Sequence, residues 1–151
     1  TFIMATTNWG TARYEGLGKD GKGHVSTQSG ALENQPYGFN TRFEDAPGTN
    51  PEELIAGAHA SCFTMALSFA LNDAGYEDGV LDTKSVVTLE KDGDGFKVSK
   101  SELTLTAQIA NIEEEEFAKI AKGAKENCPL SKLLDCEITL EHTLNSEFAV
   151  G

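Results

Sequence analysis

Two cysteines in different parts of the chain have surroundings that suit a redox pair. Cys62 lies in the run 54–72, which contains no Asp, Glu, Lys or Arg. Cys128 directly precedes Pro129, where the amide groups of a following helix could lower the pKa of its thiol. A thiolate that attacks the O–O bond of a peroxide becomes a sulfenic acid, and a second thiol converts that acid to a disulfide. The alternative for Cys62 is an apolar core residue, because free cysteine is among the most buried residue types.

The third cysteine has a different environment. Cys136 lies between Asp135 and Glu137, whose carboxylates would raise the pKa of its thiol, so we expect a structural role for it. Three cysteines are too few, and odd in number, for a secreted disulfide scaffold, and the first residues lack the layout of a signal peptide. We therefore expect a reducing, cytoplasmic location.

A metal site is the other chemistry that these residue types allow. His59 and Cys62 form an H-x-x-C pair, which Cys128, Cys136 and His142 could complete. No C-x-x-C or H-x-x-x-H pair accompanies it, and such pairs are typical of zinc sites. We predict no metal and no cofactor, and we interpret His59 as a packed, hydrogen-bonded helix residue rather than a general base.

A thiolate in an apolar helix needs a positive group nearby. Before residue 75 the basic residues are Arg13, Lys19, Lys22 and Arg42. Arg42 lies in the aromatic segment YGFNTRF, where its guanidinium could stabilise the thiolate and polarise a peroxide while a carboxylate holds its planar fork. The alternative is a surface salt bridge. Four aromatic residues would form an apolar mouth for substrate, or else pack in the core: Tyr37, Phe39, Phe43 and Phe63.

The elements that position these residues follow from periodicity and turn signals. Alternating and β-branched residues predict strands, Gly and Pro clusters predict turns, and apolar residues at helical spacing predict helices. The expected order is strands over 2–10, 11–18 and 24–32, a loop over 34–50, a helix over 51–72, a hairpin over 85–109, a helix over 111–128, a short helix over 129–134 and a strand over 136–144. This order predicts an α+β fold with antiparallel sheet.

The helix predicted over 51–72 starts at Pro51, which suits a first helical position, and closes at Gly75. Its apolar residues are not confined to one stripe, so one sheet covers only part of its surface and a second subunit is the expected cover. The run is about long enough to span a bilayer. Small and polar residues interrupt it, however, and we expect a buried core or dimer helix and no membrane.

Length and charge limit the number of domains and the kinds of binding partner. The 151 residues predict a single domain over 1–151. The chain has 24 acidic and 12 basic residues, and the ratio is the same before residue 75 (8 and 4) as after it (16 and 8). A phosphate-binding surface needs clustered Lys and Arg, so nucleic acid and anionic membranes are not expected partners.

Several segments together carry a family resemblance. They are GHVSTQSGAL, NQPYGFNTRFE, GTNPEELIAGAHASCFTMAL and CPLSKLL. The sequence closely resembles the OsmC branch of the OsmC/Ohr peroxidase family over residues 9–144, and both cysteine motifs are intact. The resemblance implies a thiol peroxidase that reduces organic hydroperoxides, and hydrogen peroxide less readily. It also implies an intertwined homodimer in which antiparallel sheets wrap central helices.

The resemblance also assigns roles to individual residues. Cys62 matches the peroxidatic cysteine, Cys128 the resolving cysteine, Arg42 the arginine of the OsmC branch, and Glu52 the carboxylate that pairs with this arginine. The implied reductant is a dithiol, for which the candidate is a lipoylated protein as in related Ohr proteins. Cys62 would thus form a sulfenic acid that Cys128 resolves as an intramolecular disulfide.

The spacing of Glu52 and Cys62 raises a geometric question. Ten residues of straight helix span about 15 Å, so the two side chains cannot meet within one unbroken helix. Either the helix breaks near Gly57, or Glu52 and Arg42 reach the thiol of the other subunit, which we favour. The rival functions are a non-catalytic, small-molecule-binding dimer with inert cysteines and a structural protein induced by stress.

Overall fold

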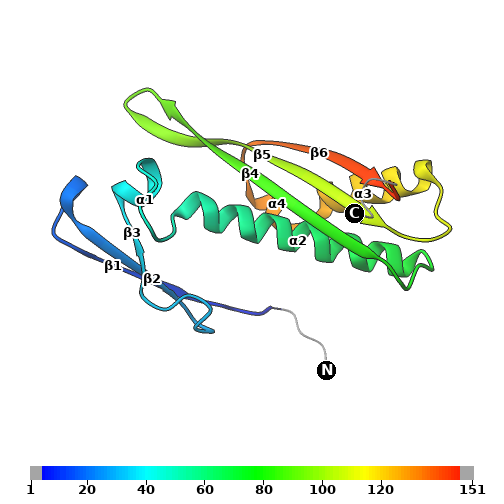
Figure 1. The fold of residues 1–151 in the computed structure, drawn as a ribbon, viewed down its shortest axis with the longest axis horizontal. Coiled ribbons are helices and arrows are strands. Elements are labelled where there is room, and N and C mark those ends of the chain that lie inside the picture. The colour runs from blue at the N-terminus through cyan, green and yellow to red at the C-terminus, as the bar shows by residue number, and fades with distance from the viewer. Residues whose placement is uncertain (1–4, 147–151) are drawn as a thin grey trace. The chain divides into compact units, whose positions relative to one another are not determined.

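The computed structural model describes residues 5–146 and divides the chain into two compact units, Thr1–Pro51 and Glu52–Gly151 (Figure 1). Each unit has its own three-stranded sheet. The single domain that the length predicts stays a prediction.

The first unit is a small antiparallel sheet with short helical turns. Its strands are β1 (Gly10–Glu15), β2 (Lys22–Thr27) and β3 (Gln35–Tyr37), in the order β1-β2-β3. A 3₁₀ turn spans Gly18–Asp20, and the helix α1 spans Phe39–Phe43.

The structure corrects two expectations in this unit. The strand expected over 2–10 is absent from residues 5–9, because β1 begins at Gly10 opposite Thr27, where its partner β2 ends; residues 2–4 lie outside the described residues. The loop expected over 34–50 contains β3 and α1. The hydroxyl of Thr41 accepts a hydrogen bond from the Gly38 N–H (2.8 Å), which closes the first turn of α1.

The second unit is built on a longer sheet, with strands β4 (Val80–Asp92), β5 (Gly95–Gln108) and β6 (Glu137–Leu144) in that order. The strands β4 and β5 form the expected hairpin, with Gly93 in its turn at φ 61°. The strand β6 pairs with β5 in parallel, which differs from the antiparallel pairing expected throughout. The segment between them holds two helices, and a connection of that length permits a parallel crossover.

The helix α2 (Pro51–Asp73) is continuous, begins at the predicted residue and ends one residue beyond the predicted range. Gly75, at φ 102°, closes it: the Gly75 N–H donates to the Asn72 carbonyl and the Tyr76 N–H to the Leu71 carbonyl, both at 3.0 Å. This pair of bonds is a Schellman motif, which needs a left-handed residue and therefore favours glycine.

The two faces of α2 differ. Its buried residues recur every fourth position, at His59, Phe63, Leu67 and Leu71. Another face exposes Met65 (60%) and Phe69 (65%). By length and composition α2 could cross a membrane, which is weak evidence, because core helices of soluble proteins pass the same test. Three residues of this buried stripe, Phe63, Leu67 and Leu71, belong to the core of the second unit.

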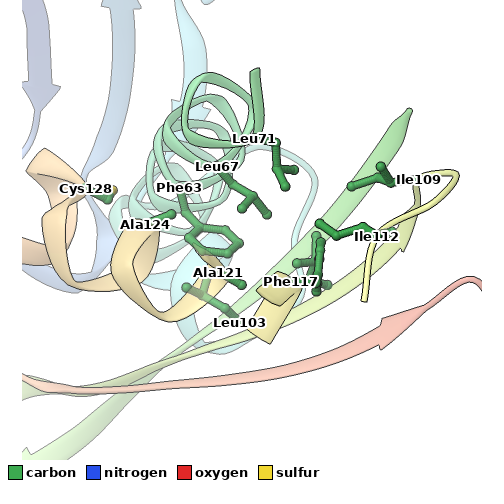
Figure 2. Packing of buried hydrophobic residues seen from close by; sticks show 12 residues of the cluster. Phe63, Leu67, Leu71, Leu103, Ile109, Ile112, Phe117, Ala121, Ala124 and Cys128 are labelled. Carbon is green, nitrogen blue, oxygen red and sulfur yellow. The ribbon is translucent and has the colours of Figure 1, made fainter. Parts of the chain in front are cut away.

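The core lies between α2, the inner face of β5 and the helix α3 (Glu114–Asn127), followed by the short helix α4 (Pro129–Leu133). Alternate residues of β5 from Ser101 to Ala107 are buried, as the hairpin pattern predicts. Figure 2 shows Phe63 and Leu67 pointing from α2 toward Phe117 and Ala121 of α3, with Cys128 at the end of α3 beside Ala124. The buried core of the second unit therefore includes the side chain of Cys128.

Candidate active site

The structure brings Cys62 and Cys128 together, although 66 positions separate them in the sequence. Cys62 lies half-buried on α2, and Cys128 lies at the junction of α3 and α4. The backbone of Cys128 serves both helices: its N–H donates to the Ala124 carbonyl (2.9 Å), and its carbonyl accepts from the Lys132 N–H (3.1 Å). Its side chain is 0% exposed, so helix packing fixes the second thiol in place.

The two thiols are free and lie close enough for Cys128 to affect the pKa of Cys62. Burial, first, and then the hydrogen bond with Cys128 raise the pKa of the Cys62 thiol above its ordinary value. The backbone N–H of Leu130, in the first turn of α4, acts in the opposite direction and lowers this pKa. The sequence predicts helix amides acting on Cys128, whereas the amide of α4 is directed at Cys62. With the net pKa raised, Cys62 requires an additional positive group to react as a thiolate.

His59 forms a buried polar network one helical turn from Cys62. The ring is 0% exposed. Its Nδ1 lies 2.7 Å from the Ser101 Oγ, and its Nε2 lies 2.9 Å from the Ser131 Oγ. The Ser101 Oγ also lies 2.9 Å from the Ser85 Oγ. Burial lowers the pKa of His59 and favours the neutral imidazole. The sequence interpretation of a packed, hydrogen-bonded histidine is confirmed.

Four of the predicted site residues line one pocket in the first unit. Tyr37, Phe39, Arg42 and Phe43 surround a space of about 360 Å³, together with Tyr14 and Lys19. The rings of Phe39 and Phe43 lie 5.0 Å apart, the Nζ of Lys19 lies 4.9 Å from the Phe39 ring, and the Cζ of Arg42 lies 5.7 Å from the Phe43 ring.

The sequence did not indicate that Tyr14 and Lys19 belong to this pocket. Tyr14 pairs with Gly23 across β1 and β2, and Lys19 lies in the turn between these strands. The available signal was the glycine-rich connection after β1, which brings this turn back toward α1. The pocket therefore combines aromatic rings with two of the four basic residues that precede residue 75.

Phe63, the fourth aromatic residue expected at the mouth, lies elsewhere. Its side chain is 0% exposed and belongs to the core beneath α2 (Figure 2). One residue of helix turns the side chain by about 100°, so Phe63 faces inward while Cys62 stays half-buried at the edge of the same core. Its substrate-binding role stays a prediction that its burial does not favour.

The third thiol belongs to Cys136, which directly precedes β6. Burial, then the charge of Asp135, raise the pKa of its thiol, while the Ser101 N–H lowers it. The direction agrees with the sequence expectation. Among residues 5–146, no three His, Cys, Asp or Glu side chains are grouped so that they could hold a metal ion.

Comparisons with known proteins identify the family. Residues 43–143 match the model of the OsmC-like protein family. The chain is 50% identical to peroxiredoxin OsmC of Escherichia coli over 137 residues, which cover 91% of this chain and 96% of that protein. The chain belongs to the OsmC-like family. The resemblance found in the sequence is thus confirmed.

More distant OsmC and Ohr proteins agree in sequence and in fold. The chain is 32% identical to the organic hydroperoxide resistance protein OhrB of Bacillus subtilis over 112 residues, 73% of this chain and 79% of that protein. The crystal structure of that OhrB matches with a TM-score of 0.69 at 29% identity, and covers 91% of this chain and 98% of that one. The OsmC-like α+β fold class is confirmed, and the chain is a cysteine-based peroxidase.

Membership of the OsmC-like family does not by itself connect Glu52 to Cys62. Both residues lie on α2, which is unbroken at Gly57, so the broken-helix alternative is wrong. Along this helix the two positions are about 15 Å apart. Arg42 belongs to the first unit and Cys62 to the second, and their meeting stays a prediction.

Proposed function

We propose that this protein reduces organic hydroperoxides, and hydrogen peroxide less readily, through a Cys62 sulfenic acid that Cys128 resolves as an intramolecular disulfide. The observation that carries the proposal is the contact of the two thiols. Two relatives support the proposal by their names: one is a peroxiredoxin, and the other is an organic hydroperoxide resistance protein.

The chemistry balances in two steps. The Cys62 thiolate attacks the outer oxygen of ROOH, the O–O bond breaks, and Cys62–SOH and RO⁻ result; RO⁻ takes a proton and leaves as the alcohol. The thiol of Cys128 then attacks the Cys62 sulfur, an S–S bond forms, and the sulfenic hydroxyl leaves as water with the proton of Cys128. A dithiol, which we propose is supplied by a lipoylated protein, reduces the disulfide and closes the cycle.

Arg42 is proposed to supply the positive charge that Cys62 needs, and Glu52 to orient Arg42. Burial, Cys128 and the Leu130 amide account for the pKa of Cys62, and none of them is a cation. Because α2 is unbroken, we propose that Arg42 and Glu52 act on Cys62 of the partner in a homodimer. The exposed apolar residues Met65 and Phe69 on α2 suit burial in such a dimer.

The substrate side of the proposal rests on the pocket of the first unit. Tyr37, Phe39 and Phe43 beside Arg42 offer an apolar surface next to a guanidinium. A hydroperoxide with an organic group would gain from burial against these rings, and hydrogen peroxide would not. We place the protein in the reducing cytoplasm, where its three thiols stay reduced between turnovers.

The test measures consumption of cumene hydroperoxide with a dithiol reductant for wild type, Cys62→Ser, Cys128→Ser and Cys136→Ser. We expect wild type and Cys136→Ser to turn over, Cys62→Ser to be inactive, and Cys128→Ser to stop after one turnover. Mass spectrometry after peroxide alone should find the Cys62–Cys128 disulfide in wild type. Folded protein in which wild type and all three variants are equally inactive would establish the rival, a binding protein with inert cysteines.

A further inference from the structure

The helix α4 carries two groups that act on Cys62, and its position therefore matters for both chemical steps. Cys128 stands directly before its first residue, and the amide of Leu130 lies in its first turn. The helix is only five residues long, and its own backbone hydrogen bonds close single turns. So short a helix depends on outside contacts to keep its place.

One such contact comes from the helix that carries Cys62. His59 precedes Cys62 by three residues, about one turn of α2, so its ring projects toward the same junction. Its Nε2 lies 2.9 Å from the hydroxyl oxygen of Ser131, the third residue of α4. The other ring nitrogen lies 2.7 Å from the hydroxyl of Ser101 on β5. The imidazole thus spans the gap between the sheet and α4.

We infer that His59 is a positioning residue: through Ser131 it holds α4 against α2 and so sets how the Cys128 thiol and the Leu130 amide approach Cys62. The inference rests on the proposed function, because it assigns a role within the chemistry of these two thiols. The hydrogen-bond partners of His59 in this role are the hydroxyls of Ser101 and Ser131. It acts through α4.

The shape of the network favours this role over that of a general core histidine. A neutral imidazole has one donor and one acceptor nitrogen, and both nitrogens have a hydroxyl partner, so the ring orientation is determined. The chain of hydrogen bonds continues from Ser101 to Ser85 on β4, within the sheet. One end of the network is therefore anchored in the sheet, and the other end holds the short helix with the resolving thiol.

Two serine variants separate positioning from general packing. Ser131→Ala removes the bond between His59 and α4, and Ser85→Ala removes a hydroxyl of the same network at its far end. Each variant loses one oxygen atom and creates no new bulk. Two readouts apply: the apparent pKa of Cys62, from its alkylation rate against pH with peptide mass spectrometry, and the rate of Cys62–Cys128 disulfide formation after one equivalent of cumene hydroperoxide.

We expect Ser131→Ala to raise the apparent pKa of Cys62 and to slow disulfide formation about tenfold, the effect of losing one well-made hydrogen bond. Ser85→Ala should stay within about twofold of wild type in both readouts. His59→Gln, which keeps a donor and an acceptor, should fall between wild type and His59→Leu. Unchanged thiol chemistry in folded Ser131→Ala would overturn the inference, as would equal losses in Ser131→Ala and Ser85→Ala.

The design keeps this inference apart from the proposed function. If wild type forms no disulfide with peroxide, the proposed function fails, and the alkylation comparison still decides whether His59 and Ser131 place the Leu130 amide on Cys62. If wild type forms the disulfide and Ser131→Ala forms it equally fast, only the positioning role fails.

Discussion

The two units of this chain hold their reactive groups in opposite ways. In the second unit Cys128 is 0% exposed and Cys62 lies at the edge of a core of apolar side chains. In the first unit Arg42 and Phe43 are exposed, and every residue of β1 is exposed as well. The thiols are thus positioned by the packing that stabilises the fold, whereas the cation sits on a lightly packed surface. Substitutions in the core of the second unit should therefore change the free energy of unfolding. Substitutions in the pocket of the first unit should change the peroxidase activity.

The largest expected effect compares two phenylalanines. Phe117 is 0% exposed in the core beneath α2, and Phe43 is 45% exposed in the pocket. Phe117→Ala should lower the free energy of unfolding by about 3–5 kcal/mol, because it leaves a cavity. Phe43→Ala should cost less than about 1 kcal/mol. Urea unfolding, followed by circular dichroism at one protein concentration, measures both.

The same pair of variants should behave in the reverse order toward substrate. Phe43→Ala should raise the KM for cumene hydroperoxide, because the substrate loses an apolar surface, with a smaller change for hydrogen peroxide. Equal losses of stability in Phe43→Ala and Phe117→Ala would contradict the contrast between the units.

Arg42 gives the next largest effect, and it concerns activity alone. Arg42→Ala should lower kcat/KM for organic hydroperoxide about 100-fold, the usual loss when a preorganised donor at a developing charge is removed. Arg42→Lys should recover only part of it, since an ammonium lacks the planar fork. Lys22→Ala, which removes a basic residue outside the pocket, is the matched control and should stay near wild type. Peroxide consumption under steady-state conditions measures all three, and full activity in Arg42→Ala would remove this residue from the mechanism.

The parts of this fold that follow from local periodicity were predictable from sequence. Pro51 and Gly75 mark the ends of α2, and the alternation along β5 marks its buried face. These signals depend on neighbouring residues only. The parallel pairing of β6 with β5 was not predictable, because it depends on how two helices fill the connection between them.

The candidate site shows the same division. The sequence named both Cys62 and Cys128, but only the packing of α2 against the α3–α4 junction shows that they touch. The bond between His59 and Ser131 joins positions 72 residues apart and has no local signature. The burial of Phe63 was not predictable for a related reason: which side of a helix faces the core is a tertiary property when apolar residues lie all round it.

The smallest expected effect is a pH dependence of the stability of the second unit. Burial lowers the pKa of His59, so as the pH falls the unfolded chain binds a proton at about 6.5, before the folded chain does. The contribution of neutral His59 to stability is therefore complete above about pH 6.5 and declines below it, until the folded pKa is reached. Its slope cannot exceed about 1.4 kcal/mol per pH unit for one proton.

His59→Gln isolates this contribution, because glutamine keeps hydrogen-bonding groups and does not titrate in this range. Urea unfolding of wild type and His59→Gln between pH 7.5 and 5 should show that wild type loses more stability on acidification than the variant does. Carboxylates contribute equally to both proteins, so the difference between the two slopes belongs to His59. Parallel pH profiles would mean that the imidazole gains its proton equally well in the folded and unfolded chains, and the buried network would then have to accommodate a charge beside the thiols.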